Sequence, residues 1–190
     1  AERMLSDCRE AIEAATGAEL SYAIGNHNRS IGARLAGEIA RRHGNEGMRD
    51  TPIDILLRGT AGQSFGAWNL DGLNMTLEGD ANDYVGKGMS GGRIVLTTGE
   101  SDRAHARRNV ICGNACLYGA TGGELFANGQ AGERFAVRNS GAKAVIEAAL
   151  ADRVVHLVSL ARKAGKAVAG YEKVKDWLGK EEARVLIQAS

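Results

Sequence analysis

The stretch Ile53-Asp54-Ile55-Leu56-Leu57-Arg58-Gly59-Thr60-Ala61 joins a strand-like apolar pattern to a Gly-x-Ala tripeptide. The same tripeptide follows three further apolar runs, at Gly79-Asp80-Ala81, Gly113-Asn114-Ala115 and Gly129-Gln130-Ala131. The four leading glycines lie 20, 34 and 16 positions apart, and each tripeptide is followed by an aromatic residue, at Phe65, Tyr84, Tyr118 and Phe135. Self-similarity at a period near 20 residues is typical of solenoids, in which each repeat stacks on its neighbours.

Short strand patterns surround these tripeptides. Besides Ile53–Arg58, the candidates are Leu73–Leu77, Arg93–Thr97, Glu124–Phe126 and Ala142–Ile146. Of the 26 glycines, 17 lie between Gly59 and Gly141, and Pro occurs once, so the glycines punctuate an ordered fold rather than a disordered linker. Antiparallel hairpins remain an alternative, but repeated corners with small residues favour a right-handed parallel β-helix.

The N-terminal 45 residues have a different pattern. Residues 2–15 carry apolar side chains at helical spacing, and Glu19–Ile24 alternates as a short strand. Ser30 is the predicted N-cap of a second helix that continues to Arg42, with basic residues at its C-terminal end. The sequence thus predicts a mainly β domain that begins with α-helices.

After Glu147 the glycine-rich pattern stops. Ala151–Lys163 is predicted to be an amphipathic helix, Tyr171–Leu178 a second helix and Val185–Ile187 a strand. We therefore place a module boundary near Ala148. The predicted domains are residues 1–148, a truncated β-helix with an N-terminal helical part (1–45), and residues 149–190, a short α/β appendage.

Composition restricts the class of protein. The net charge is +1, which argues against a globally basic nucleic-acid binder, and no apolar run approaches the roughly 20 residues of a membrane span. Three cysteines, Cys8, Cys112 and Cys116, cannot all pair within one chain. Together with the lack of a signal peptide, this predicts a soluble protein of the reducing cytoplasm.

Three motifs invite a functional interpretation. Gly86-Lys87-Gly88-Met89-Ser90-Gly91 matches the dinucleotide pattern G-x-G-x-x-G, but it leads into a strand-like run rather than a helix, so we interpret it as a corner. Cys112 and Cys116 lack a second Cys/His pair nearby that would complete a metal site. The four histidines form no motif, so we predict no catalytic, cofactor-binding or metal-binding residue.

The C-terminal segment carries a basic edge around a helix–Gly–helix turn. Its candidate RNA contacts are Lys163, Lys166, Gly170 and Lys173. A Lys/Arg cluster beside helix termini is suited to phosphate, but it is also typical of an ordinary solvated helix face.

Long peptides resemble the C-terminal GXGXG domain of the glutamate synthase large subunit. They are Gly25–Gly44, Leu57–Gly66, Leu77–Gly92 and Arg108–Ser140, in order over about residues 1–147. The resemblance implies a cytoplasmic β-helix that packs between catalytic modules of a large amidotransferase. In that family, glutamine hydrolysis, the flavin and the iron–sulfur cluster belong to other domains, so no catalytic or cofactor residue carries over.

A second resemblance begins after the first one ends. Val154–Ser190 is similar to the opening of the kink-turn RNA-binding family of ribosomal-type proteins, chiefly through Leu160–Lys166 and Gly170–Val174. In the glutamate synthase family, glycine-rich β-helix turns continue past the segment that matches Gly141, but this chain has none of them. Its last repeat would therefore leave an open strand edge. We hypothesise that the amphipathic segment 151–190 caps this end.

The sequence therefore predicts a noncatalytic structural domain of glutamate synthase type, involved in glutamate biosynthesis, with no activity of the isolated chain. Its expected partners are other domains of such an enzyme, or further copies that associate through the open end. Two alternatives are an RNA-binding module that uses the basic C-terminal segment and an engineered or shuffled chimera without activity.

Overall fold

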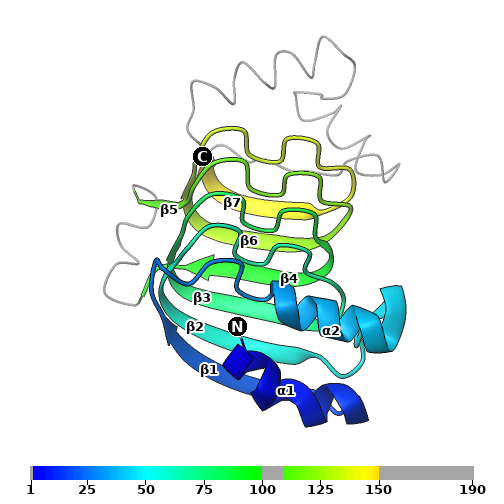
Figure 1. The fold of residues 1–190 in the computed structure, drawn as a ribbon. Helices are drawn as coiled ribbons and strands as arrows, with labels where there is room; N and C mark the ends of the chain where they lie inside the picture. The colour runs from blue at the N-terminus through cyan, green and yellow to red at the C-terminus, as the bar shows by residue number, and fades with distance from the viewer. Residues whose placement is uncertain (1, 100–108, 150–190) are drawn as a thin grey trace.

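The structure is a computed structural model that describes residues 2–99 and 109–149. Within them the fold is mainly β, with one parallel sheet and two α-helices near its N-terminal end (Figure 1). This confirms the prediction of parallel strands preceded by helices. The appendage predicted for residues 149–190 falls almost entirely outside the described residues. The helical elements are α1 (Glu2–Ala14), α2 (Ala33–His43) and the 3-10 turn η1 (Gly44–Glu46).

Seven strands form the sheet. They are β1 (Ala18–Ile24), β2 (Ile53–Ala61), β3 (Leu73–Ala81), β4 (Ser90–Thr97), β5 (Val110–Cys112), β6 (Gly122–Ala131) and β7 (Lys143–Ala149). Every pairing is parallel: β1 to β4 follow one another, β6 pairs with β4, and β7 pairs with β6. The three-residue β5, which the sequence did not indicate, pairs with β3 and β6.

Strand register gives the true period of the repeat. Residue partners in neighbouring strands lie 20 positions apart between β2 and β3, 19 between β3 and β4, and 19 between β6 and β7. Between β4 and β6 the separation rises to 31, as in the pair Arg93–Glu124. This repeat is longer than its neighbours, and its extra length falls between Thr97 and Val110, around residues outside the described part. The separation between β1 and β2 is larger still, at 35, because α2 lies between them.

The strand register also shows that the glycine spacings of 20, 34 and 16 positions, counted in the sequence, do not join equivalent residues. Ala81 and Ala131 both pair with Cys112, so Gly113 lies three positions beyond the place that Gly59, Gly79 and Gly129 occupy. The tripeptides that start at those three glycines are also not corners, because they end strands β2, β3 and β6. Close approach of backbone explains the glycine: a Cβ on Gly79, where φ is 149°, would overlap the carbonyl oxygen of Gly59.

The chain between the strands is as regular as the sheet. We call these stretches return segments; they are residues 25–32, 62–72, 82–89, 113–121 and 132–142. In four of them one N–H donates to the carbonyl oxygen of the preceding segment, at 2.7–2.9 Å: Gly66 to Ile31, Gly86 to Phe65, Leu117 to Val85 and Ala136 to Cys116. Other N–H groups donate forward, as from Ser64 to Asp83 and from Tyr84 to Asn114, each at 2.9 Å. The return segments therefore form a second hydrogen-bonded side opposite the sheet.

Left-handed backbone makes this side possible. Of the ten non-glycine residues with positive φ in the described chain, nine lie in the return segments. Ser30 is one of them, with φ of 50°, and its N–H donates to the carbonyl oxygen of Gln63. The prediction that Ser30 caps α2 is thus wrong: the N-cap is Gly32, without a side-chain capping bond.

The core lies between the sheet and the return segments. One column of equivalent positions in it consists of Ile31, Phe65, Val85 and Cys116, all buried, and the partly buried Phe135. Apolar side chains of the strands, such as Leu77 and Leu96, and of both helices complete the same cluster. The aromatic repeat inferred from sequence is therefore only half correct, because Tyr84 and Tyr118 stand at other positions and are not buried.

Candidate functional site

The G-x-G-x-x-G stretch forms no nucleotide site in this fold. Gly86 and Gly88 have φ of 63° and 65° within a return segment, and Gly91 already belongs to β4. No helix begins there to hold a pyrophosphate, as the dinucleotide fingerprint requires. The stretch thus spans the end of a return segment and the start of β4, rather than a strand-to-helix turn.

The cysteines are buried thiols. Cys8, Cys112 and Cys116 are free, and each is at most 1% exposed. The neighbouring Cys112 thiol and burial raise the pKa of Cys116, so this sulfur stays protonated and unreactive at neutral pH. Across residues 2–99 and 109–149, no cluster of three or more His, Cys, Asp or Glu side chains could hold a metal ion.

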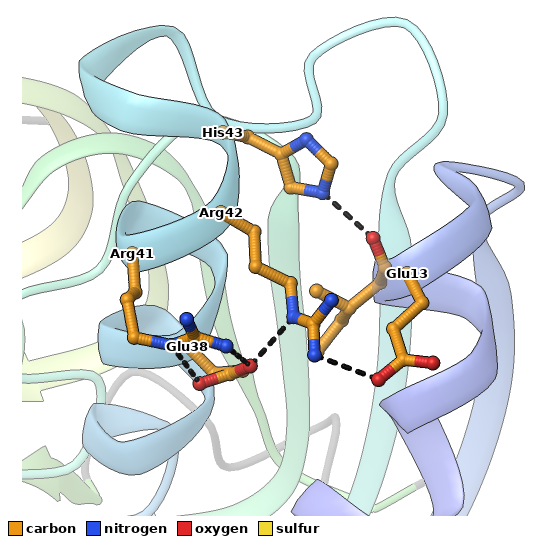
Figure 2. A network of polar contacts seen from close by, with 6 residues as sticks. Glu13, Glu38, Arg41, Arg42 and His43 are labelled. Carbon is orange, nitrogen blue, oxygen red and sulfur yellow. Dashed lines mark hydrogen bonds and ion pairs between the residues drawn. The ribbon is translucent and has the colours of Figure 1, made fainter.

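A polar network joins the two helices (Figure 2). Glu38 accepts hydrogen bonds from Arg41 and Arg42, which lower its pKa to about 2, and Arg42 also binds Glu13 of α1 at 2.7 Å. His43 Nε2 lies 2.7 Å from the carbonyl oxygen of Ile12, which can only accept, so this nitrogen carries the proton. Each group is engaged by a partner, and the network therefore fixes α1 against α2 rather than offering a free acid or base.

A polar hollow of about 390 Å³ runs along the starts of the strands. Asp71 pairs with Arg49 there and accepts the N–H of Gly92 at 3.0 Å, and both contacts lower the pKa of this carboxyl group. Across the hollow, Arg93 pairs with Glu124 at 2.9 Å. Glycines line the space between these pairs, at Gly72, Gly92, Gly123 and Gly141. Because Arg49 and the N–H of Gly92 hold Asp71 ionised, this carboxyl group lacks the raised pKa of a catalytic acid.

One surface was missed by sequence reasoning. We call it the aromatic face, and its residues project from four consecutive return segments: Trp68, Tyr84, Lys87, Tyr118, Arg134 and Arg138. No local motif unites them. The signal that could have found them is the common spacing from the start of each return segment, once Gly113 is aligned with Gly62 and Gly132. The RNA contacts predicted at Lys163, Lys166, Gly170 and Lys173 lie outside the described residues.

Comparison with known proteins identifies relatives over most of the chain. A family model described as the GXGXG motif matches residues 1–157. Ferredoxin-dependent glutamate synthase 2 of Synechocystis sp. is 55% identical over 143 residues, which is 75% of this chain and 9% of that protein. The glutamate synthase (NADPH) large chain of Azospirillum brasilense is 50% identical over 145 residues, covering 76% of this chain and 10% of its own length. Glutamate synthase (NADH) of Schizosaccharomyces pombe is 39% identical over 191 residues, or 94% of this chain and 9% of that protein. This chain spans about a tenth of the length of these relatives.

Proposed function

Because this chain belongs to the GXGXG motif family, we propose that it is a noncatalytic structural domain of a glutamate synthase-type enzyme. One observation supports the proposal most: the space between the sheet and the return segments is filled by an apolar core that runs through every described repeat. Carboxylates beside it, such as Glu38 and Asp71, are paired with arginines. Such a body offers a rigid surface for neighbouring domains and contributes nothing to a reaction directly.

We further propose that the repeats continue as a right-handed β-helix. Parallel strands on one side and hydrogen-bonded return segments on the other are the two sides that such a helix needs. In this proposal residues 1–148 form the β-helix domain and 149–190 a separate appendage that caps its open end, and the protein works in the cytoplasm. In the part of the chain that the structure describes, no helix is long and apolar enough to cross a membrane.

A hybrid enzyme tests the structural role. Residues 1–149 of this chain would replace the matching segment of the Synechocystis ferredoxin-dependent glutamate synthase 2, and glutamate formation from glutamine and 2-oxoglutarate would be measured. We expect an active hybrid and an inactive isolated 190-residue chain. A hybrid that folds but forms no glutamate, or turnover by the isolated chain, would contradict the proposal.

Two alternatives have their own tests. RNA binding through Lys163, Lys166, Gly170 and Lys173 predicts a salt-dependent gel shift that is lost on charge reversal at the three lysines. A shuffled or engineered chimera predicts a cooperative melt without any activity in the hybrid. Either result would displace the structural role.

A further inference from the structure

The aromatic face gathers exposed rings and cations on the return segments. Trp68 is 59% exposed and Tyr84 39%, in a chain with only 5% aromatic residues. Lys87 Nζ lies 5.3 Å from the ring centroid of Tyr84, and Arg138 Cζ lies 5.8 Å from that of Tyr118. Backbone hydrogen bonds between successive segments hold these residues side by side, from Trp68 N–H to Lys87 at 2.8 Å and from Gly88 N–H to Tyr118 at 2.9 Å.

The backbone under this face is strained. Trp68 and Arg138 have φ of 57° and 59°, while Gly88 and Gly119 take the same position in the two segments between them. A left-handed conformation costs a non-glycine residue about 1–2 kcal/mol, which glycine avoids. Because the Trp68 side chain is mostly exposed, its burial repays little of that cost. Other return-segment residues share the left-handed conformation, so Trp68 is distinguished by carrying a large, mostly exposed ring where the next two segments have glycine.

The charges of the face point to its ligand. Elsewhere in the described chain, most arginines of the surface pair with carboxylates, among them Arg34, Arg42, Arg49, Arg58 and Arg93, although Arg9 and Arg29 do not. On the aromatic face no described carboxylate forms an ion pair with Lys87, Arg134 or Arg138. Lys87 and Arg138 beside tyrosine rings, together with Arg134 on the same return segment as Arg138, complement a surface rich in Asp and Glu.

We propose that the aromatic face is a docking surface for an acidic polypeptide, with Trp68 as its anchor. Trp, Tyr and Arg are the residues that carry most binding energy at protein interfaces. The rings of Tyr84 and Tyr118 are each covered by a cation, which leaves few free faces for stacking bases and favours a protein over a nucleic acid. This inference rests on the proposed function, in which the acidic partner is another domain of the same enzyme.

Fluorescence of Trp68 tests the proposal in the full-length chain. A Trp177→Phe background leaves Trp68 as the only tryptophan, and the probes are polyglutamate, polylysine and single-stranded poly(dT). We expect saturable quenching by polyglutamate alone, weakened by salt and roughly tenfold weaker in a Lys87→Glu/Arg138→Glu variant. The matched control is Arg58→Glu, a charge reversal on the opposite, sheet side, which should leave the affinity unchanged.

Trp68→Gly separates binding from folding. Since glycine relieves the strain, this variant should keep or raise the melting temperature and still lose most of the affinity for polyglutamate, read by calorimetry because its tryptophan signal is gone. Retained affinity in either variant, or preference for poly(dT), would overturn the proposal. The activity of the hybrid enzyme is measured separately from polyglutamate binding. If the hybrid is active but the chain does not bind polyglutamate, only the docking surface is contradicted. If the chain binds polyglutamate but the hybrid is inactive, only the structural role is contradicted.

Discussion

The sheet side and the return side of this molecule connect the same repeats by different means. On the sheet side, the backbone is extended and alternate side chains point inward, as in the burial of Leu73, Met75 and Leu77 along β3. On the return side, nine non-glycine residues accept positive φ, and seven of them, such as Ser64 and Leu117, donate their N–H to a neighbouring segment. The sheet side is thus encoded by side-chain pattern, whereas the return side depends on backbone conformations that most residues disfavour.

The outward surfaces of the two sides differ as well. Polar side chains pair across the strands, as Arg58 does with Glu78 at 2.8 Å and Asn74 with Asp54 at 3.0 Å. Such pairs satisfy polar groups on the outer face of β2 and β3 within the chain itself. The aromatic face on the other side leaves its cations without described carboxylate partners, which is why we assign docking to that side.

Core packing should give the largest effect. Phe65→Ala removes a fully buried ring of the return side and should destabilise the protein by about 3–5 kcal/mol in urea unfolding. The matched control is Tyr84→Ala in the next return segment. Tyr84 stands one position before the equivalent of Phe65 and is 39% exposed, so its loss should cost far less. Equal losses would mean that the return side is not the core wall described above.

Backbone contact on the sheet side comes next. Gly79→Ala places a Cβ against the carbonyl oxygen of Gly59 at a φ of 149°, and should cost roughly 2–3 kcal/mol. The same change at Gly37 in α2, where nothing lies within 4 Å, should stabilise the protein by about 0.5–1 kcal/mol. Thermal melts of both variants suffice, and a loss at Gly37 similar to that at Gly79 would refute the role of backbone approach.

The polar hollow predicts a dependence on pH. Arg49 and the N–H of Gly92 lower the folded-state pKa of Asp71, so this residue contributes stability above its unfolded pKa and loses it as the pH falls through the folded value. Asp71→Asn should therefore lower stability at pH 7 by about 1 kcal/mol and flatten the acid limb of the stability curve. Arg49→Gln should flatten the same limb. An unchanged limb in both variants would show that the pair contributes nothing.

The smallest effect is expected when alanine is replaced by glycine once on each side. Ala136→Gly, at φ of 57° in a return segment, should stabilise the protein by about 0.5–1 kcal/mol. Ala127→Gly, in the extended strand β6 and 4% exposed, should destabilise it by about 1 kcal/mol. Opposite signs in calorimetry would confirm that the return side stores strain, and equal signs would contradict it.

Sequence reasoning succeeded where side chains determine the backbone. The period-two pattern located β2, β3, β4, β6 and β7 to within a few residues, because inward positions must be apolar. It missed β5, since three residues are too few to show a period. It also treated Gly113 as equivalent to Gly59, Gly79 and Gly129. This was wrong because additional residues between Thr97 and Val110 lengthen that repeat.

The return side could not be predicted in the same way. Ser30 looked like a helix cap because Ser usually occupies that position, and nothing local reveals its φ of 50°. Trp68 becomes informative only when it is compared with Gly88 and Gly119 at the same place in later segments. That comparison needs the strand register, and the register is a property of the folded repeats.

Because hydrogen bonds join neighbouring repeats on two opposite sides, the described body has the mechanics of a stiff rod. A force along the stack must break the strand pairing and the return-segment bonds of one junction together, and a bend must stretch one of the two sides. Modules attached to such a rod would keep a fixed separation whatever their own motions.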